Sequence, residues 1–313
     1  MKTRWCSIPC CVVVLGGVLL QVNCKKEKAA ASSDPPPVIS YNVPPSVIQE
    51  DWKDHTQQIF RMYYDSTLAV YFDKEVDKTI TWPNTFINQV WQYTKKTYGY
   101  EFGPDQRLYA VFHTGKYAGG HPGYYYSSEH GNRNVIDCGS NNSNAWITGT
   151  GNDLDLVTHE VGHIVESATN GAKGSPAFPI WKDSKWMEIY IYDVYKNLGR
   201  TADAERWFNL CQGTVDPFPR ANTQWFKNWF YPIYSQHGGK EVLSRFFKLV
   251  AIHFPKNSSR QFTRDMNWGE FIHFWSGAAG TNLKTLATDA FGWPDEWETM
   301  FNKARTDFPG FTY

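Results

Sequence analysis

The sequence has no excess of charge of either sign, and this absence excludes several classes of protein. Its 313 residues include 31 lysines and arginines and 31 aspartates and glutamates, for a formal net charge of +0. Nucleic-acid-binding domains usually carry a basic patch, whereas no basic run here is longer than a pair such as Lys25-Lys26. Internal repeats and a nucleotide-binding glycine motif are also missing. We therefore expect no nucleic acid among its partners.

The sequence also lacks an apolar run long enough to cross a bilayer. The run from Cys11 to Leu20 has ten residues, whereas a transmembrane helix needs about 20. Lys2 and Arg4 precede this run, so residues 1–23 are predicted to be an export signal. The run ends in a segment, LQVNC, that resembles a bacterial lipobox, although two of its positions are polar rather than small. We expect Cys24 to carry the lipid, with plain secretion as the alternative.

Residues 24–50 contain little that can be buried. Lysine, alanine, serine and proline dominate them, including Pro35-Pro36-Pro37, and such segments are typical of flexible tethers. We expect an exported lipoprotein of the bacterial outer membrane or cell surface, held to the membrane by its lipid only, or otherwise a secreted or periplasmic protein. Residues 51–313 are then long enough for one domain with a large core.

Cysteine is scarce once the export signal is removed, because only Cys24, Cys138 and Cys211 remain. No C-x-x-C spacing is present, which excludes a cysteine metal site of the common kind. Cys138 and Cys211 could pair in an oxidising compartment. Two free buried thiols are the alternative.

One motif carries recognisable chemistry, the H-E-x-x-H sequence from His159 to His163. Residues four apart lie on the same face of a helix, so both imidazoles can bind one metal ion. Glu160 can then act on a water bound to that metal, whose pKa zinc lowers. Apolar residues recur around the motif at helical spacing. Thr150 and Asp153 are spaced like a capping box, Asn152 or Asp153 could also cap the helix directly, and Asn170-Gly171 is the expected end of the helix.

The third zinc ligand is predicted to be Glu188. A third histidine at position 169 would complete the extended motif, but Thr169 stands there. Of the carboxylates that follow, Glu166 crowds a position beside His163, and Asp183 lies in a turn with a short reach. Glu188 lies on a predicted helix among apolar residues, where an unpaired carboxylate would be costly. Glycine at position 162 indicates that some other part of the chain packs closely against the motif helix.

These residues resemble the gluzincin peptidases, which combine H-E-x-x-H with a glutamate on a following helix. More narrowly, residues 153–199 resemble the basic-secretory-protein type and, less closely, the enhancin-like mucin-degrading peptidases. Many gluzincins have an aspartate one turn after the ligand glutamate, where this chain has Tyr192. Asp193 and Asp155 are therefore both candidates for orienting a histidine. The resemblance implies an α+β, zincin-like metallopeptidase fold, with a small mixed β-sheet upper lobe and a mostly helical lower lobe.

Other segments carry weaker predictions. Residues 68–72, 108–113 and 134–138 are predicted strands, residues 82–98 a helix, and residues 115–128 a loop rich in glycine and tyrosine that precedes the motif helix. An acidic turn at residues 73–77 is more typical of solvated surface than of a calcium site. Additional metal ligands (His113, His121, His130) and oxyanion-stabilising residues (His237, His253, His273 or a tyrosine) stay open.

The function predicted from these features is zinc-dependent hydrolysis of peptide bonds in an extracellular protein or glycoprotein. Zn²⁺ is held by His159, His163 and Glu188, and Glu160 is the catalytic base. One alternative is an aromatic-rich lipoprotein that binds glycans or proteins and has a non-catalytic zincin fold. Another is a zinc hydrolase that acts on a non-peptide bond.

Overall fold

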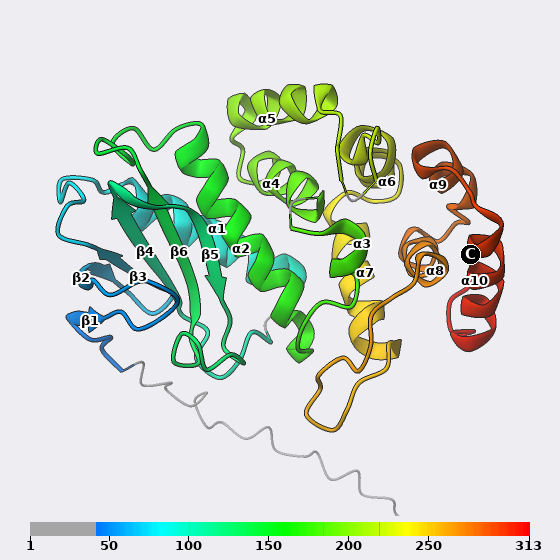
Figure 1. The fold of residues 1–313 in the computed structure, drawn as a ribbon, viewed down its shortest axis with the longest axis horizontal. Coiled ribbons are helices and arrows are strands. Elements are labelled where there is room, and N and C mark those ends of the chain that lie inside the picture. Colours follow the sequence, from blue (N-terminus) through cyan, green and yellow to red (C-terminus); the bar gives the residue numbers. More distant parts are fainter. Residues whose placement is uncertain (1–41, 100, 184, 219) are drawn as a thin grey trace, which may run out of the picture. The chain divides into compact units, whose positions relative to one another are not determined.

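A six-stranded mixed sheet is built from the first half of the chain (Figure 1). The computed structural model describes residues 42–99, 101–183, 185–218 and 220–313. The strand order is β1-β2-β3-β4-β6-β5, with β1 (Val47–Gln49), β2 (Gln58–Tyr64), β3 (Leu68–Phe72), β4 (Leu108–Thr114), β5 (Lys116–Gly123) and β6 (Asn134–Ser140).

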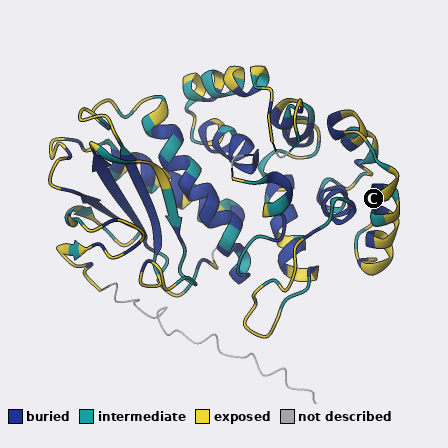
Figure 2. Cartoon of the chain, in the orientation of Figure 1, coloured by how far each residue is buried: buried dark blue, intermediate teal, exposed yellow. Residues whose placement is uncertain are grey.

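The three central strands β3, β4 and β6 run parallel to one another, and the outer strands pair antiparallel. All residues of β3 and β4 are buried, as expected for parallel strands with both faces covered. Figure 2 shows this buried centre against the more exposed outer strands. The strands predicted at residues 68–72, 108–113 and 134–138 are therefore confirmed.

The predicted loop at residues 115–128 is wrong in its first half, because Lys116–Gly123 form the edge strand β5. Glycine weakens a strand, but it also marks places where another part of the chain approaches closely. At Gly139 of β6, a Cβ atom would lie 1.9 Å from the backbone oxygen of Tyr117. At Gly120, a Cβ atom would meet the side chain of Glu160. The glycines of this strand pair therefore allow close approach rather than a free loop.

The folded chain begins earlier than residue 51. The compact unit starts at Asn42, and β1, which lies within the predicted tether, pairs with β2 between Val47 and Phe60. The predicted export signal and Cys24 lie outside the described residues. No helix in the described part of the chain is long and apolar enough to cross a membrane.

Two helices pack against the sheet. α1 (Trp82–Tyr98) contacts β3, and α2 (Asn152–Ala168), which carries the motif, contacts β5 and β6. The predicted helix at residues 82–98 is confirmed, with Pro83 in its first turn and Gly99 at its end. The described chain beyond α2 is mostly helical (Figure 1). Its elements are η1 (Thr169–Gly171), α3 (Phe178–Trp181), α4 (Lys185–Asn197), α5 (Thr201–Gly213), the π-helix η2 (Phe226–Phe230), α6 (Tyr231–Gln236), α7 (Lys240–His253), α8 (Trp268–Ala279), α9 (Lys284–Phe291) and α10 (Asp295–Asp307).

Apolar side chains form two clusters. The larger one includes Phe72, Phe112 and Cys138 of the sheet together with α1, α2 and the later helices. The smaller one includes Trp52, Tyr71 and Tyr109, and the alternation of side chains along β3 and β4 places it on the opposite face of the sheet. Seven tryptophans are fully buried, so much of the aromatic content of the sequence forms core. The fold is mixed α/β, which confirms the coarser part of the predicted class.

Candidate metal and catalytic site

The motif lies on α2, whose two ends differ in how well the sequence predicts them. The left-handed end is confirmed, because Asn170 and Gly171 have φ of 54° and 65°. The predicted side-chain cap is wrong. Gly151, with φ of 55°, precedes the helix and no side chain caps it. The Asp153 carboxylate instead accepts hydrogen bonds from the Gly149 N–H and the Thr148 hydroxyl at 3.1 and 3.2 Å.

The two histidines of the motif converge as their spacing predicts. Their Nε2 atoms lie 3.1 Å apart, so the two nitrogens cannot both carry a proton in that direction. Burial, together with the adjacent His163, lowers the pKa of His159 to about 3, which leaves its imidazole neutral. A neutral imidazole nitrogen is the form that binds metal.

Glu166 orients His163. Its Oε2 lies 3.3 Å from the His163 Nδ1, and its other oxygen accepts hydrogen bonds from the Ser175 hydroxyl and the Trp181 indole. Burial lowers the pKa of His163, but the hydrogen bond and charge of Glu166 outweigh burial and raise it. A carboxylate on the far nitrogen of a metal-binding histidine is a common arrangement. Sequence analysis missed this role, and the signal was the three-residue spacing on one helix.

Glu160 is the buried carboxylate beside this pair. Glu160 is 3% exposed, and burial raises the pKa of its carboxyl to about 7. Its Oε2 has no hydrogen-bond partner among the described residues. The edge strand β5 passes directly over it, since a Cβ atom at Gly120 would lie 2.0 Å from Glu160 Oε1.

Asp183 is the third potential ligand that the structure brings to the histidines. Its Oδ1 lies 3.4 Å from the His163 Nε2, and ligand atoms of His159, His163 and Asp183 all lie within 4.8 Å of one another. Asp183 follows Lys182, whose φ of 53° turns the chain after α3. The expectation that a short side chain in this turn lies out of reach is therefore wrong.

Glu188 faces a different group of residues. Its Oε1 accepts a hydrogen bond from the Lys185 ammonium at 2.6 Å, and Lys185 also pairs with Asp216. Burial raises the pKa of the Glu188 carboxyl to about 7, against the opposing charge of Lys185. Glu188 as a zinc ligand stays a prediction. Ser184, its predicted helix cap, lies outside the described residues.

The packing of α4 on α2 explains this orientation. A Cβ atom at Gly162 would lie 2.4 Å from the Met187 sulfur and 2.9 Å from the Tyr190 ring. The predicted close approach at Gly162 is thus confirmed, and Met187 and Tyr190 form the face of α4 turned toward the motif. Successive residues are about 100° apart on a helix, so Glu188 is turned away from that face.

Three of the remaining candidates, Asp193, Asp155 and His273, have structural partners. Asp193 accepts hydrogen bonds from the hydroxyls of Tyr93, Tyr98 and Tyr234, and Asp155 accepts from Tyr195 and Arg206. These contacts connect helices to one another, and among the described residues neither aspartate is hydrogen-bonded to His159 or His163. His273 contacts Tyr313 and the backbone oxygen of Phe308. Cys138 and Cys211 are free and buried, so they do not pair.

A hollow open to solvent lies at the start of α2, before the motif. It has a volume of about 600 Å³ and is lined by β5, by the connection from β6 to α2 and by the first turns of α2, including Ala118, Gly119, Trp146, Asn152 and Leu156. Ala118, Gly119 and Gly120 are exposed residues of this edge strand. An extended segment could therefore pair with β5 next to Glu160.

Comparison with known proteins adds little to this geometry. No protein-family model matches the chain, and no curated protein matches it. A solved structure, the M1 zinc metallopeptidase from Deinococcus radiodurans, aligns with 82% of this chain at 11% sequence identity and a TM-score of 0.38. The chain spans about half the length of that protein, since the alignment covers 50% of it. At this TM-score, the likeness identifies neither a fold family nor an activity.

Proposed function

We propose that the chain is an exported zinc-dependent peptidase with a zincin-like fold, acting on peptide bonds of a protein or glycoprotein outside the cytoplasm. The observation that carries the proposal is the convergence of His159 and His163 beside a buried carboxylate, Glu160, under an exposed strand edge. The donor set suits zinc, because two imidazole nitrogens and one carboxylate are the ligands of many catalytic zinc sites.

His159 and His163 would hold the ion, together with one carboxylate. The described positions favour Asp183 for this place over the sequence-predicted Glu188. When bound, zinc would polarise the peptide carbonyl and lower the pKa of a water molecule. Glu160, the buried carboxylate beside the histidine pair, would take a proton from the attacking water molecule and pass it to the departing amine. The exposed backbone of β5 would align the substrate.

Replacement of the base tests this proposal. Glu160→Gln should retain metal and lose hydrolysis of casein or mucin by about 10²–10⁴-fold or more, because the amide cannot accept the proton. Glu205→Gln, the same substitution on the exposed surface of α5, is the control and should match wild type. Unchanged turnover in Glu160→Gln would refute the mechanism. Wild-type protein that binds zinc but hydrolyses nothing would favour the non-catalytic binding lipoprotein.

We also propose that the chain is exported and anchored by lipid on Cys24. Support for this comes only from the order of charged, apolar and cysteine residues in positions 1–24. Labelled palmitate supplied to a Gram-negative expression host should tag the wild-type chain and not Cys24→Ala. Labelling of both chains, or of neither, would rule out this anchor.

A further inference from the structure

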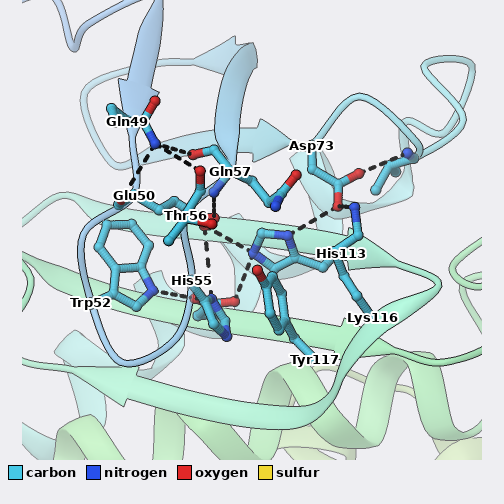
Figure 3. Close-up of polar contacts among 12 residues, drawn as sticks. Gln49, Glu50, Trp52, His55, Thr56, Gln57, Asp73, His113, Lys116 and Tyr117 are labelled. Atoms are coloured by element: carbon cyan, nitrogen blue, oxygen red, sulfur yellow. Dashed lines mark hydrogen bonds and ion pairs between the residues drawn. The ribbon is translucent and has the colours of Figure 1, made fainter.

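A second group of potential metal ligands lies on the opposite face of the sheet from α2. It consists of Glu50, His55, His113 and Asp137, all of them buried. His113 belongs to β4 and Asp137 to the neighbouring β6. Glu50 and His55 come from the segment between β1 and β2, which folds over that face (Figure 3). None of these residues belongs to the site around His159.

The four side chains direct their donor atoms at a common point. His113 Nε2 lies 2.9 Å from Glu50 Oε1 and 3.2 Å from Asp137 Oδ1. His55 Nδ1 lies 2.9 Å from Asp137 Oδ2 and 4.0 Å from Glu50 Oε1. One ligand atom from each of the four residues fits within a span of 4.8 Å. Figure 3 shows the imidazoles of His55 and His113 beside Glu50.

Beyond their close contacts within the group, these ligand atoms are not satisfied. Glu50 Oε1, His55 Nδ1, His113 Nε2 and Asp137 Oδ1 are all buried, and outside the group none has a hydrogen-bond partner among the described residues. An unsatisfied buried polar atom typically costs about 1–3 kcal/mol. Four such atoms facing one another are what a cation would satisfy together.

Neighbouring groups fix the orientation of these ligands. His113 Nδ1 lies 3.1 Å from Asp73 Oδ2, which turns its Nε2 toward the group. The Trp52 indole donates to Asp137 Oδ2 at 2.6 Å, and the Gln57 N–H donates to Glu50 Oε2 at 3.3 Å. Each carboxylate therefore has one oxygen held by the protein and one left for the group. Metal-binding histidines and carboxylates are usually supported in this manner.

The charges of the surrounding residues are compatible with a bound cation. Three carboxylates (Glu50, Asp73 and Asp137) surround His113, and Lys116 lies 3.4 Å from Asp73. With both imidazoles neutral, these three carboxylates and the one ammonium carry two net negative charges, which a divalent cation would balance.

We propose that Glu50, His55, His113 and Asp137 form a second, structural site for a divalent metal, with zinc as the best fit. Two imidazoles and two carboxylates suit tetrahedral zinc, and four protein ligands leave no open position for catalysis. The ion would fasten the segment of residues 50–57 to β4 and β6, and so tie the beginning of the folded unit to the centre of the sheet.

Metal analysis of a variant without the other site tests this proposal. We expect the full chain with His159→Ala and His163→Ala to retain about one zinc per chain after desalting, and adding Glu50→Gln to lower this to near zero. Cobalt(II) in place of zinc should give the intense visible absorption of a tetrahedral site. The zinc analysis of the His159→Ala/His163→Ala chain leaves the four proposed ligands intact, so its result does not depend on whether variants of those ligands fold.

Two results would overturn the proposal. One is a folded His159→Ala/His163→Ala chain that retains no zinc and whose melting temperature does not fall with chelator. The other is zinc that survives Glu50→Gln and is lost with His121→Ala, because His121, Glu129 and His130 form a separate group of potential ligands. Loss of the ion and a lower melting temperature only in Glu50→Gln would support it. Because the catalytic histidines are absent, failure of this test leaves the proposed peptidase function untouched.

Discussion

Adding one methyl group to β5 should displace the proposed base without removing a metal ligand. In Gly120→Ala, the new Cβ would lie 2.0 Å from Glu160 Oε1, 2.3 Å from its Cδ and 2.6 Å from its Cγ. Ordinary contacts of a Cβ atom begin near 3.4 Å, so the carboxylate must move by about 1 Å or more. The backbone of Gly120 itself tolerates alanine, because it is not among the residues with positive φ.

The expected cost falls mainly on catalysis. A displacement of about 1 Å at a reacting group can lower the rate by about 10²-fold, and complete loss of a general base by about 10²–10⁴-fold. We therefore expect kcat to fall at least about 10²-fold with zinc content unchanged. Overpacking costs about 1–3 kcal/mol of stability, partly offset by about 0.4–1 kcal/mol from replacing a flexible glycine. The melting temperature should fall by only a few degrees.

Peptide hydrolysis, zinc content and thermal melting should be measured on the same preparation. Gly213→Ala is the matched control, because a Cβ atom there meets nothing within 4 Å and its φ is not positive; it should behave as wild type. A Gly120→Ala enzyme with wild-type kcat would show that β5 does not lie against the base, or that Glu160 is not the base.

Two further predictions concern carboxylates. Asp183→Asn should weaken zinc binding severely and Glu188→Gln by at most about 10–100-fold, as measured by zinc titration; the reverse order would restore Glu188 as the ligand. Burial raises the pKa of the Asp193 carboxyl to about 6, although three tyrosine hydroxyls oppose the change. A raised pKa means that the folded chain binds the proton more tightly, so the stabilising contribution of Asp193 is full below about pH 4 and is lost as pH rises through about 6. Asp193→Asn should flatten this part of the curve of melting temperature against pH. An unchanged slope would contradict the raised pKa of the Asp193 carboxyl.

Elements with local signals were predictable from the sequence. Pro83 and Gly99 mark both ends of α1, and the apolar run of residues 68–72 identifies β3. The histidine pair of α2 follows directly from the repeat of the helix, which places residues four apart on one face. In each case, the information lies within a few residues of the element that it specifies.

Features that depend on distant partners were not predictable. Strand β5 contains glycines that weaken a strand in isolation, and it forms because β6 supplies its hydrogen bonds. The group around His113 joins Glu50 to Asp137 across the fold, and no spacing in the sequence connects them. The available signal was a polar residue inside each of two strongly apolar strands, since buried charged groups require partners.

The choice between Asp183 and Glu188 as the third ligand depends on which face of α4 is turned toward the motif, and sequence alone does not give that rotation. Side-chain length and apolar surroundings favoured Glu188, but the Lys185 ammonium supplies the partner that a buried carboxylate needs. The rotation of α4 favours Asp183, because the close approach of Met187 and Tyr190 to Gly162 turns Glu188 away from the motif. Asp183, which precedes α4, lies 3.4 Å from the His163 Nε2. The glycine inside the motif therefore bears on which carboxylate can reach the histidines.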